Sequence, residues 1–215
     1  MRILITAGPT REYLDDVRFL SNASTGRMGC ALARAAAAAG HRVVLVHGPL
    51  ACEAPECDAV VPVVSAADMC REVIARVAEA DAVVMAAAVA DYRPAERVAG
   101  KIRKGPAERT LRLAPTPDIA AEIGRDKGGR VHVGFALEAA NARANARRKL
   151  REKNFDLIVL NSPAAIGADR TDVELLFASG EAEPLAAATK DRIAGRIIAG
   201  VEQLTTRKGA ADGPR

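Results

Sequence analysis

The sequence predicts an α/β fold in which helices cover both faces of a doubly wound, mostly parallel sheet. Short apolar runs alternate along most of the chain with segments of helical composition, an order typical of such sheets. The runs are almost continuously hydrophobic, as expected of strands that are buried on both faces. With 215 residues, 49% of them hydrophobic, the chain is long enough to bury one sizeable core.

Each element is predicted from its local composition. Six apolar runs end at Gly, Pro, Asn or small residues and are expected to be strands: 2–8, 42–48, 59–64, 81–88, 131–137 and 156–161. The segments of helical composition between them are 27–39, 66–79, 117–126 and 141–153. Near the end of the chain, 173–180 and 182–187 suggest a hairpin across Ser179-Gly180, and 189–204 a closing helix. We therefore predict a Rossmann-like sheet followed by a C-terminal hairpin.

The chain is predicted to form a single domain over residues 1–207. It contains no internal repeat and no linker long enough to mark a domain boundary. Residues 208–215 are polar and rich in glycine, so we expect them to form a flexible tail.

Charge and cysteine content narrow the class of protein. The 31 Lys and Arg residues exceed the 27 Asp and Glu residues by four, a mild excess that suits small anionic ligands better than nucleic acid. The four cysteines contain no C-x-x-C pair and are expected to be reduced thiols. The sequence shows neither a secretory signal nor an apolar run of membrane-spanning length. A cytoplasmic location is expected.

The stretch "SNASTGRMG" (21–29) is the first candidate for a ligand site. It follows the first strand, which ends at Gly8, and it leads into an alanine-rich helix. Asn22, Ser24, Gly26 and Gly29 combine polar side chains with exposed backbone N–H groups at a helix N-terminus, an arrangement that binds phosphate. Plain helix capping is the alternative, but a cap needs only one such residue.

Two common nucleotide-site motifs are missing. A dinucleotide site would place its glycine fingerprint directly after the first strand and an acidic residue at the end of the second. Here the first turn reads "AGPTRE" and the second strand ends in His47-Gly48. A GxxxxGK[ST] loop is also absent, so the sequence predicts no standard P-loop enzyme.

The segment 86–108 is the second candidate. Ala87 and Ala88 are small enough for a ligand to lie against a strand end, and Asp91 offers a carboxylate to a metal-bound phosphate. Tight helix–sheet packing is an equally good explanation of the alanines. A long polar loop follows, and its "KIRK" motif (101–104) suits a cationic lid over a polyphosphate, although such clusters are more often simply solvated.

Lys149 and Lys153 form the third candidate. They lie four residues apart in the predicted helix 141–153, hence on one face. Their mutual repulsion would be offset by an anion or a polar base between them. Taken alone, a solvated basic face is the simpler interpretation.

Together these motifs resemble the bacterial phosphopantothenoylcysteine synthetase family of coenzyme A biosynthesis. The match runs from residue 3 to about residue 200, and it is carried by "ITAGPTREYLDDVRFLSNASTGRMG", "AAAVADYRP", "KIRK", "PDI", "VGFALE" and "RRKLREKNFDLIVLN". In many bacteria this domain follows a flavin-dependent decarboxylase in one chain. Because Met1 stands directly before the first strand here, we expect the synthetase domain alone and a separate decarboxylase.

The resemblance implies a CTP-dependent, Mg²⁺-requiring ligase that works as a homodimer. The carboxylate of 4′-phosphopantothenate attacks the α-phosphate of CTP, giving an acyl-cytidylate and pyrophosphate, and the amine of L-cysteine then displaces CMP. Fixed cations and N–H donors stabilise the charge that develops at phosphorus.

The resemblance also implies roles for individual residues. Lys101 matches the lid lysine that promotes acyl-nucleotide formation, and Asn22 the asparagine that turns the intermediate into product. Asp91 is expected to meet the metal, and Ala87 and Ala88 to line the phosphopantothenate side together with Asn22 and Asp91. The nucleotide-binding positions are Gly8, Ser24, Gly26, Gly29, Asp118, Phe135, Lys149, Lys153 and Asn161.

Two departures and two alternatives accompany this expectation. Pro115-Thr116 occupies a position where the family often has a basic residue and Asn, and Arg103 replaces a lysine of the lid. A dinucleotide- or flavin-dependent reductase is one alternative function, although its cofactor fingerprint is missing. A non-catalytic nucleotide-binding protein is the other.

Overall fold

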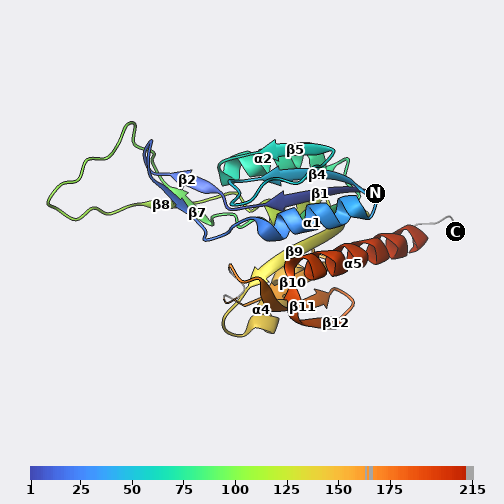
Figure 1. Cartoon of the computed structure of the whole chain (residues 1–215). Helices are drawn as coiled ribbons and strands as arrows, with labels where there is room; N and C mark the ends of the chain where they lie inside the picture. Colours follow the sequence, from blue (N-terminus) through green and yellow to red (C-terminus); the bar gives the residue numbers. More distant parts are fainter. Residues whose placement is uncertain (163, 165–166, 212–215) are drawn as a thin grey trace.

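A single mixed sheet forms the centre of the molecule in the computed structural model, which describes residues 1–162, 164 and 167–211 (Figure 1). The strands of this 8-stranded sheet lie in the order β12-β11-β10-β9-β6-β1-β4-β5. Their bounds are β1 (Arg2–Ala7), β4 (Arg42–His47), β5 (Ala59–Pro62), β6 (Ala82–Met85), β9 (Val131–Leu137), β10 (Leu157–Asn161), β11 (Arg170–Phe177) and β12 (Ala182–Thr189). Strands β1, β4, β5, β6, β9 and β10 run parallel to one another, whereas β11 pairs in the antiparallel sense with both β10 and β12.

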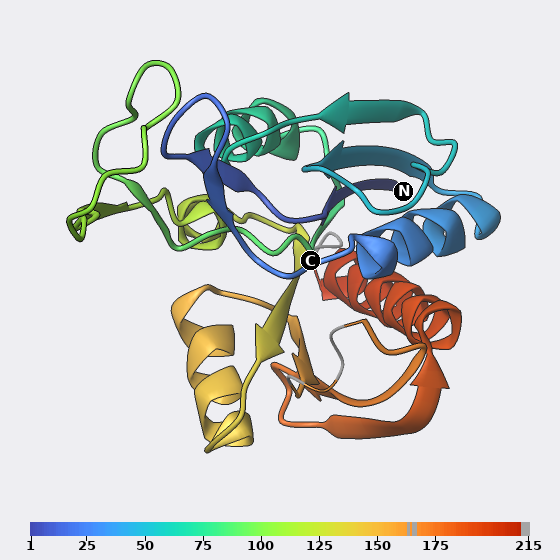
Figure 2. The same cartoon turned by 60° about the vertical axis from the view of Figure 1, so that its left-hand side comes forward.

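Helices cover both faces of the sheet. Helices α1 (Arg27–Ala38) and α5 (Lys190–Ala211) lie side by side on one face, as Figures 1 and 2 show. The opposite face carries α2 (Ala66–Val77), α3 (Ile119–Arg125) and α4 (Ala142–Glu152). Alternate residues of β1 accordingly pack into different cores, with Ile3 and Ile5 toward α1 and Leu4 toward α2. The doubly wound sheet with its C-terminal hairpin is confirmed.

Small residues allow α1 to lie close to the sheet. Cys30, Ala31, Leu32, Ala33 and Ala36 form its buried face. A Cβ atom on Gly29 would stand 2.3 Å from the Cβ atom of Ala7 in β1, a separation that atoms in a packed core do not adopt. Helix–strand packing therefore explains Gly29 without any ligand.

Two short strand pairs leave the sheet and form an arm, which we define as residues 11–21 and 92–115 (Figure 1). Strand β2 (Arg11–Tyr13) pairs with β3 (Phe19–Ser21), and β7 (Tyr92–Pro94) pairs with β8 (Leu113–Pro115). Residues 95–112, the lid loop, connect β7 to β8 at the outer end of the arm. A long polar loop was predicted here, but none of these four strands was.

The C-terminal helix is longer than predicted. Helix α5 continues to Ala211, so the expectation of a flexible tail is wrong for residues 208–211, and residues 212–215 lie outside the described part. The last turn is held because Lys208 Nζ lies 2.9 Å from Asp156 Oδ1 and donates to the carbonyl oxygen of Arg130 at 2.8 Å. Within the described residues, none of the helices has the length and apolarity needed to span a bilayer.

Candidate active site at the carboxyl edge of the sheet

The strand order reverses direction between β1 and β6, which are neighbours in the sheet. From β1 the chain passes through α1 on one face to β4, whereas from β6 it passes through α3 on the opposite face to β9. Open α/β sheets bind their ligands at such a reversal, beyond the carboxyl ends of the two strands, and we call this place the crevice.

The N-terminus of α1 lies at this edge of the sheet, next to the end of β1. Its N-cap is Gly26, with φ at 76°, and no side chain caps it. Ser24 Oγ accepts a bond from the Gly26 N–H at 3.3 Å. Within the described residues, the N–H groups of Met28 and Gly29 have no protein acceptor. Free N–H groups and the helix dipole make this end suitable for an anion.

Glycines let three segments meet at this point. A Cβ atom on Gly26 would lie 2.2 Å from Leu50 Cδ2 and 3.3 Å from the Cα atom of Gly8. Gly8 itself has φ at 75°, a left-handed conformation that glycine adopts without steric cost. The end of β1, the start of α1 and the loop after β4 are thus in contact.

Asn22 ties the loop before α1 to the segment after β6. Its Nδ2 atom donates to the carbonyl oxygens of Ala88 at 3.1 Å and Val89 at 3.0 Å. Because the N-cap of α1 is Gly26, Asn22 is not the cap of this helix. Its Oδ1 atom has no recorded bond among the described residues and can accept one.

Ala87 and Ala88 lie beside the end of β1. The Ala87 N–H donates to Thr6 Oγ1 at 3.1 Å, and the Ala88 N–H donates to the Gly8 carbonyl oxygen at 2.9 Å. Pro9 and Ala88 also form an isolated parallel bridge. The structure therefore brings Gly8, Asn22, Ala87, Ala88 and the α1 N-terminus together.

Lys149 reaches the same edge from α4. Its Nζ atom donates to the carbonyl oxygen of Phe135, near the end of β9, at 2.8 Å. Burial lowers the pKa of the Lys149 ammonium, and the nearby charges of Glu138, Asp91 and Asp118 act in the opposite direction. Lys149 is half-buried, so the interpretation of this position as a solvated basic face is wrong.

Lys153 is also held by the protein. It forms an ion pair with Asp118, the N-cap of α3, whose carboxylate accepts a bond from the Ala121 N–H at 3.0 Å. Burial by itself raises the pKa of Asp118, but the bonds from Lys153 and Ala121 outweigh it and hold the pKa below its usual value. The ion pair fastens α4 to the start of α3.

Asn161 ends β10 with an unsatisfied acceptor. Its Oδ1 atom is buried and has no hydrogen-bond partner among the described residues. The main-chain oxygen of Asn161 accepts a bond from the Glu138 N–H at 3.1 Å. Buried polar atoms are rarely left unpaired, so an orphaned acceptor at this edge is a candidate contact for a ligand or water.

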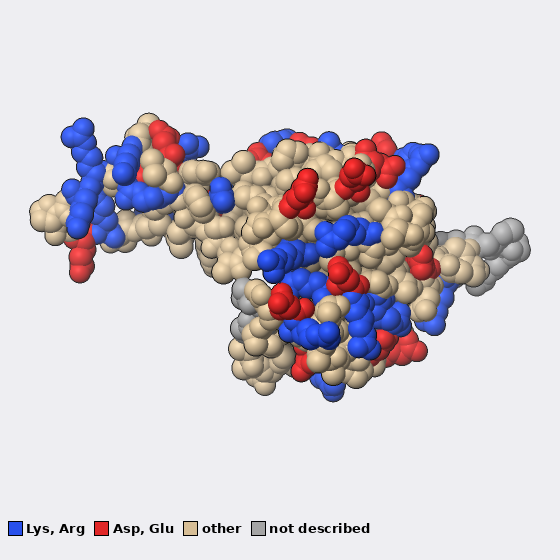
Figure 3. All heavy atoms as spheres, viewed as in Figure 1, with Lys and Arg blue, Asp and Glu red and all other residues tan. Residues whose placement is uncertain are grey.

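Lys101 is the one predicted residue that lies apart from the others. Its neighbours Gly100 and Ile102 are bonded to Asp16 and Asp15 in the β2–β3 turn, at the outer end of the arm. Basic side chains predominate there on the face that Figure 3 shows. Within one chain, the structure therefore does not place Lys101 beside Asn22 or the α1 N-terminus.

Several organising residues could not be found from the sequence. Thr10 is fully buried, and its Oγ1 atom accepts a bond from the Ala90 N–H at 3.0 Å. Asp15 is fully buried in the arm. The sequence shows that both residues are polar and follow the first apolar strand, but it does not show which groups they bond.

The site has few groups that could hold a metal ion. Among residues 1–162, 164 and 167–211 there is no group of three or more His, Cys, Asp or Glu side chains with the required arrangement. Asp91 is exposed, and its main-chain oxygen accepts a bond from the Thr116 N–H at 3.0 Å. One free carboxylate is enough for Mg²⁺ when phosphate oxygens and water supply the other ligands.

Comparisons with known proteins give one family. The model of the DNA/pantothenate metabolism flavoprotein C-terminal domain matches residues 1–204. The chain is 41% identical over 212 residues to the coenzyme A biosynthesis bifunctional protein CoaBC of Bacillus subtilis (strain 168), covering 96% of this chain and 52% of that protein. It thus spans about half the length of the curated relatives it matches.

Solved structures agree with this family. A crystal structure of the C-terminal domain of a bifunctional CoaBC protein superimposes with a TM-score of 0.83 and 38% identity, covering 96% of both chains. A mutant of Cab2 in complex with phosphopantothenate-cysteine has a TM-score of 0.78 at 16% identity, covering 99% of this chain and 89% of that one. At that identity, the second similarity shows the fold alone.

Proposed function

Because the chain belongs to the DNA/pantothenate metabolism flavoprotein C-terminal domain family, we propose that it joins 4′-phosphopantothenate to L-cysteine at the expense of CTP. The products are 4′-phosphopantothenoyl-L-cysteine, CMP and pyrophosphate. The observation that carries the proposal is the uncapped N-terminus of α1, which opens at the strand-order reversal beside Asn22 and the Ala87-Ala88 strand end. This arrangement provides an anion site next to a surface that a second substrate can approach.

The first step is activation of the carboxylate. The phosphopantothenate carboxylate attacks the α-phosphorus of CTP, the bond to the β-phosphate oxygen breaks, and pyrophosphate leaves. Ser24, Gly26 and the free N–H groups of the first turn of α1 hold the triphosphate. Donors fixed before the reaction stabilise the developing negative charge without reorganisation.

Magnesium supplies charge neutralisation to the triphosphate when it is bound, and Asp91 is the carboxylate that would hold it. In this proposal the same carboxylate also contacts phosphopantothenate, together with Ala87 and Ala88. A single protein carboxylate is in keeping with the absence, among the described residues, of a preformed metal cage.

The nucleoside lies toward α4 in this proposal. Lys149 and Lys153 present ammonium groups beside Phe135 and Asp118, and the orphaned Asn161 Oδ1 atom offers a buried acceptor. An amino group on a pyrimidine base is a donor that suits such an acceptor. This supports CTP as the co-substrate.

The second step forms the amide bond. The amine of cysteine attacks the acyl carbon, and CMP leaves with the oxygen that had belonged to the carboxylate. Asn22 orients the activated acyl group, because it already spans the gap between the α1 loop and the Ala88-Val89 backbone. The decarboxylase expected as a partner would act on the carboxyl group that cysteine brings to the product.

Lys101 enters the site from a second copy of the chain. The arm places it away from its own Asn22, and the arm exposes large apolar side chains to solvent, namely Val17, Phe19, Tyr92, Val98, Leu111 and Leu113. Exposed apolar surface concentrated in one projection marks an interaction site. A homodimer that buries both arms would deliver each Lys101 to the partner's crevice.

Pyrophosphate release tests the function. The purified chain is mixed with phosphopantothenate and either CTP or ATP, with and without cysteine, and we expect sustained release only with CTP and cysteine together. Lys101→Gln should lower release at least a hundredfold, while Arg109→Gln, on the same loop, should have little effect. Nucleotide binding without release would instead support the non-catalytic alternative.

A further inference from the structure

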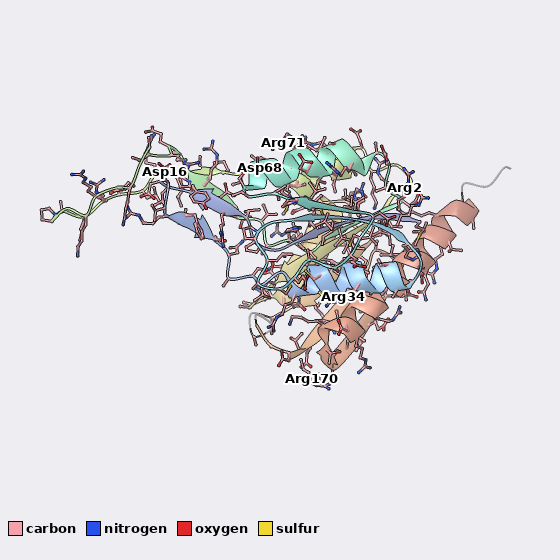
Figure 4. All side chains as sticks on the ribbon, turned by 45° about the horizontal axis from the view of Figure 1, so that its top comes forward. Arg2, Asp16, Arg34, Asp68, Arg71 and Arg170 are labelled. Atoms are coloured by element: carbon pink, nitrogen blue, oxygen red, sulfur yellow. The ribbon has the colours of Figure 1, made fainter. Side chains whose placement is uncertain are left out.

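The first half of the lid loop is fastened to the β2–β3 turn. The Val98 N–H donates to the Leu14 carbonyl oxygen at 2.8 Å, and the Asp16 N–H donates to the Gly100 carbonyl oxygen at 3.2 Å. A second bond joins the same two residues: the Gly100 N–H donates to Asp16 Oδ2 at 2.8 Å. Figure 4 labels Asp16 and shows it out on the arm, away from the sheet. This part of the loop is therefore not a free polar segment.

Asp15 lies at the centre of this attachment. Its side chain is fully buried, although it belongs to a projecting turn. The Oδ1 atom accepts from the N–H groups of Val17 at 2.8 Å and Arg18 at 2.7 Å, bonds that form the turn itself. The Oδ2 atom accepts from Arg18 Nε at 2.9 Å and from the Ile102 N–H at 3.1 Å, bonds that reach the lid loop.

Arg18 completes a cyclic arrangement. Its Nη2 atom lies 2.6 Å from Asp15 Oδ2 and also donates to the Ile102 carbonyl oxygen. Both polar main-chain groups of Ile102 are thus held by one carboxylate–guanidinium pair. Burial by itself raises the pKa of the Asp15 carboxyl, but bonds from Arg18, Val17 and Ile102 together hold the pKa far below its usual range. These bonds therefore stabilise the carboxylate in its charged form.

We propose that Asp15 is a positioning residue for the reaction: its Oδ2 atom, together with Arg18, fixes Ile102 and thereby the place of the adjacent Lys101. This inference rests on the proposed function for the role of Lys101. The attachment itself does not, since it can be measured without any substrate. Gly100 and Ile102 are both bonded to the turn, so Lys101 is the residue that the two bonds bracket.

Asp15→Asn separates the two functions of the carboxylate, which are to form the turn through Oδ1 and to hold the lid loop through Oδ2. An asparagine can keep its oxygen at the Oδ1 position and so retain the turn. Its NH₂ group then replaces Oδ2 and faces the guanidinium donors of Arg18 and the Ile102 N–H, from which it cannot accept a bond. The substitution should therefore release the lid loop and leave the hairpin formed. Asp58→Asn is the matched control, because Asp58 also accepts a main-chain bond, from the Val43 N–H at 2.8 Å, but far from the arm.

Limited proteolysis gives a readout independent of catalysis. Trypsin can cut after Lys101 and after Arg109, and the second cut serves as an internal reference on the same loop. In the unmodified protein we expect slow initial cutting at Lys101. Asp15→Asn should raise the ratio of initial cutting rates, Lys101 over Arg109, about tenfold, the effect expected from losing bonds to a charged acceptor. Asp58→Asn should leave it unchanged.

Activity gives the second readout. Asp15→Asn should slow pyrophosphate release about tenfold while the KM for cysteine changes less than about twofold. Combined with Lys101→Gln, it should cause no further loss, because Asp15 acts through Lys101. An unchanged cutting ratio would overturn the proposal, and so would faster cutting with normal pyrophosphate release.

Failure of the proposed function remains distinguishable from failure of this inference. If the unmodified protein releases no pyrophosphate with any triphosphate, the function is wrong, while the cutting ratio still decides whether Asp15 holds the loop. Should Asp15→Asn fail to fold, Arg18→Lys takes its place, because one ammonium cannot bridge Asp15 and the Ile102 carbonyl oxygen as the guanidinium does. It should raise the cutting ratio in the same direction, and no rise would contradict the inference.

Discussion

Lys149 illustrates how a single charged residue at the sheet edge is prepared for a ligand. The residue is half-buried, burial lowers the pKa of its ammonium group, and Nζ donates a hydrogen bond to the Phe135 carbonyl oxygen. A desolvated cation gains more from an incoming phosphate or base than a hydrated one does. The position therefore favours ligand contact over plain surface charge.

We predict that Lys149→Met raises the KM for CTP about tenfold or more and leaves the KM for cysteine nearly unchanged. Arg148→Met is the matched control, since Arg148 lies next to it on α4 but faces solvent and pairs with Glu152. Initial rates at varied CTP and varied cysteine give both constants. Equal changes in the two KM values would remove Lys149 from the nucleotide site.

His132 is a second residue with an unusual environment, at the opposite end of the sheet. It is fully buried in β9, and neither ring nitrogen has a hydrogen-bond partner among the described residues. Burial lowers its pKa to about 4, helped by the charges of Lys127, Arg130 and Lys208 and opposed by Asp156. The folded protein therefore keeps this ring neutral where an unfolded chain would bind a proton.

Stability should fall as the pH drops through this window. Between the ordinary histidine pKa of 6.5 and about 4, the unfolded state binds more protons, so the free energy of unfolding decreases with falling pH. For His132 alone, the loss between about pH 7 and about pH 5 should be about 2 kcal/mol. Urea unfolding of the wild type and His132→Leu measures it, and an equally steep decrease in the variant would contradict this assignment.

At the scale of elements, the contact of α1 with β1 allows a test of whether Gly29 is needed for helix packing or for ligand binding. Gly29→Ala would place a methyl group 2.3 Å from the Ala7 Cβ atom, so we expect a loss of about 1–3 kcal/mol in the free energy of unfolding. Adding Ala7→Gly should restore part of it. Denaturant curves of the two variants measure this, while unchanged stability with impaired CTP binding would return Gly29 to the triphosphate loop.

The elements of the sheet were predictable because their signals are local. β1, β4 and β9 are continuous apolar runs, and α1 is marked by its alanines, so neighbouring residues alone define them. The site at the carboxyl edge follows from that order, since open parallel sheets bind ligands there. We expected four site residues to meet at this edge, and the structure brings them into contact there: Gly8, Asn22, Ala87 and Ala88.

The arm was not predictable for the opposite reason. Its strands have three residues each, are partly polar, and exist only through pairing: β2 with β3 and β7 with β8. The Asp15 carboxylate accepts a bond from the Ile102 N–H, which lies 87 positions away in the sequence. Local sequence patterns carry no information on such a long-range contact. The motif "KIRK" could therefore be recognised from the sequence, but its position in the fold could not be predicted.

At the scale of the whole molecule, the arm is the basis of the proposed dimer. It carries Lys101 and exposes apolar side chains such as Tyr92, which is 56% exposed, and Leu113, which is 49% exposed. A two-fold symmetric dimer buries the same surface of both copies. In that assembly each crevice would combine Asn22 from one chain with Lys101 from its partner.

Mixing two inactive variants tests this sharing of sites. After subunit exchange, Lys101→Gln and Asn22→Asp should together recover about a quarter of the wild-type rate, because half of the dimers are mixed and each holds one intact site. Asn22→Asp mixed with Lys149→Met should give no more activity than the two variants measured separately, because the proposal takes Asn22 and Lys149 of each site from the same chain. If native mass spectrometry shows mixed dimers without recovered activity, the site does not use Lys101 of the partner chain.

In the proposed reaction, the carboxylate of phosphopantothenate is activated by attack on the α-phosphorus of CTP, which forms an acyl-cytidylate. The most direct measurement uses 4′-phosphopantothenate with ¹⁸O in its carboxylate, CTP and cysteine, followed by mass spectrometry of the nucleotide product. An acyl-cytidylate passes one carboxylate oxygen to the phosphate of CMP, so we predict CMP that carries one ¹⁸O atom together with unlabelled pyrophosphate. Unlabelled CMP, or label recovered in inorganic phosphate beside CDP, would contradict the account.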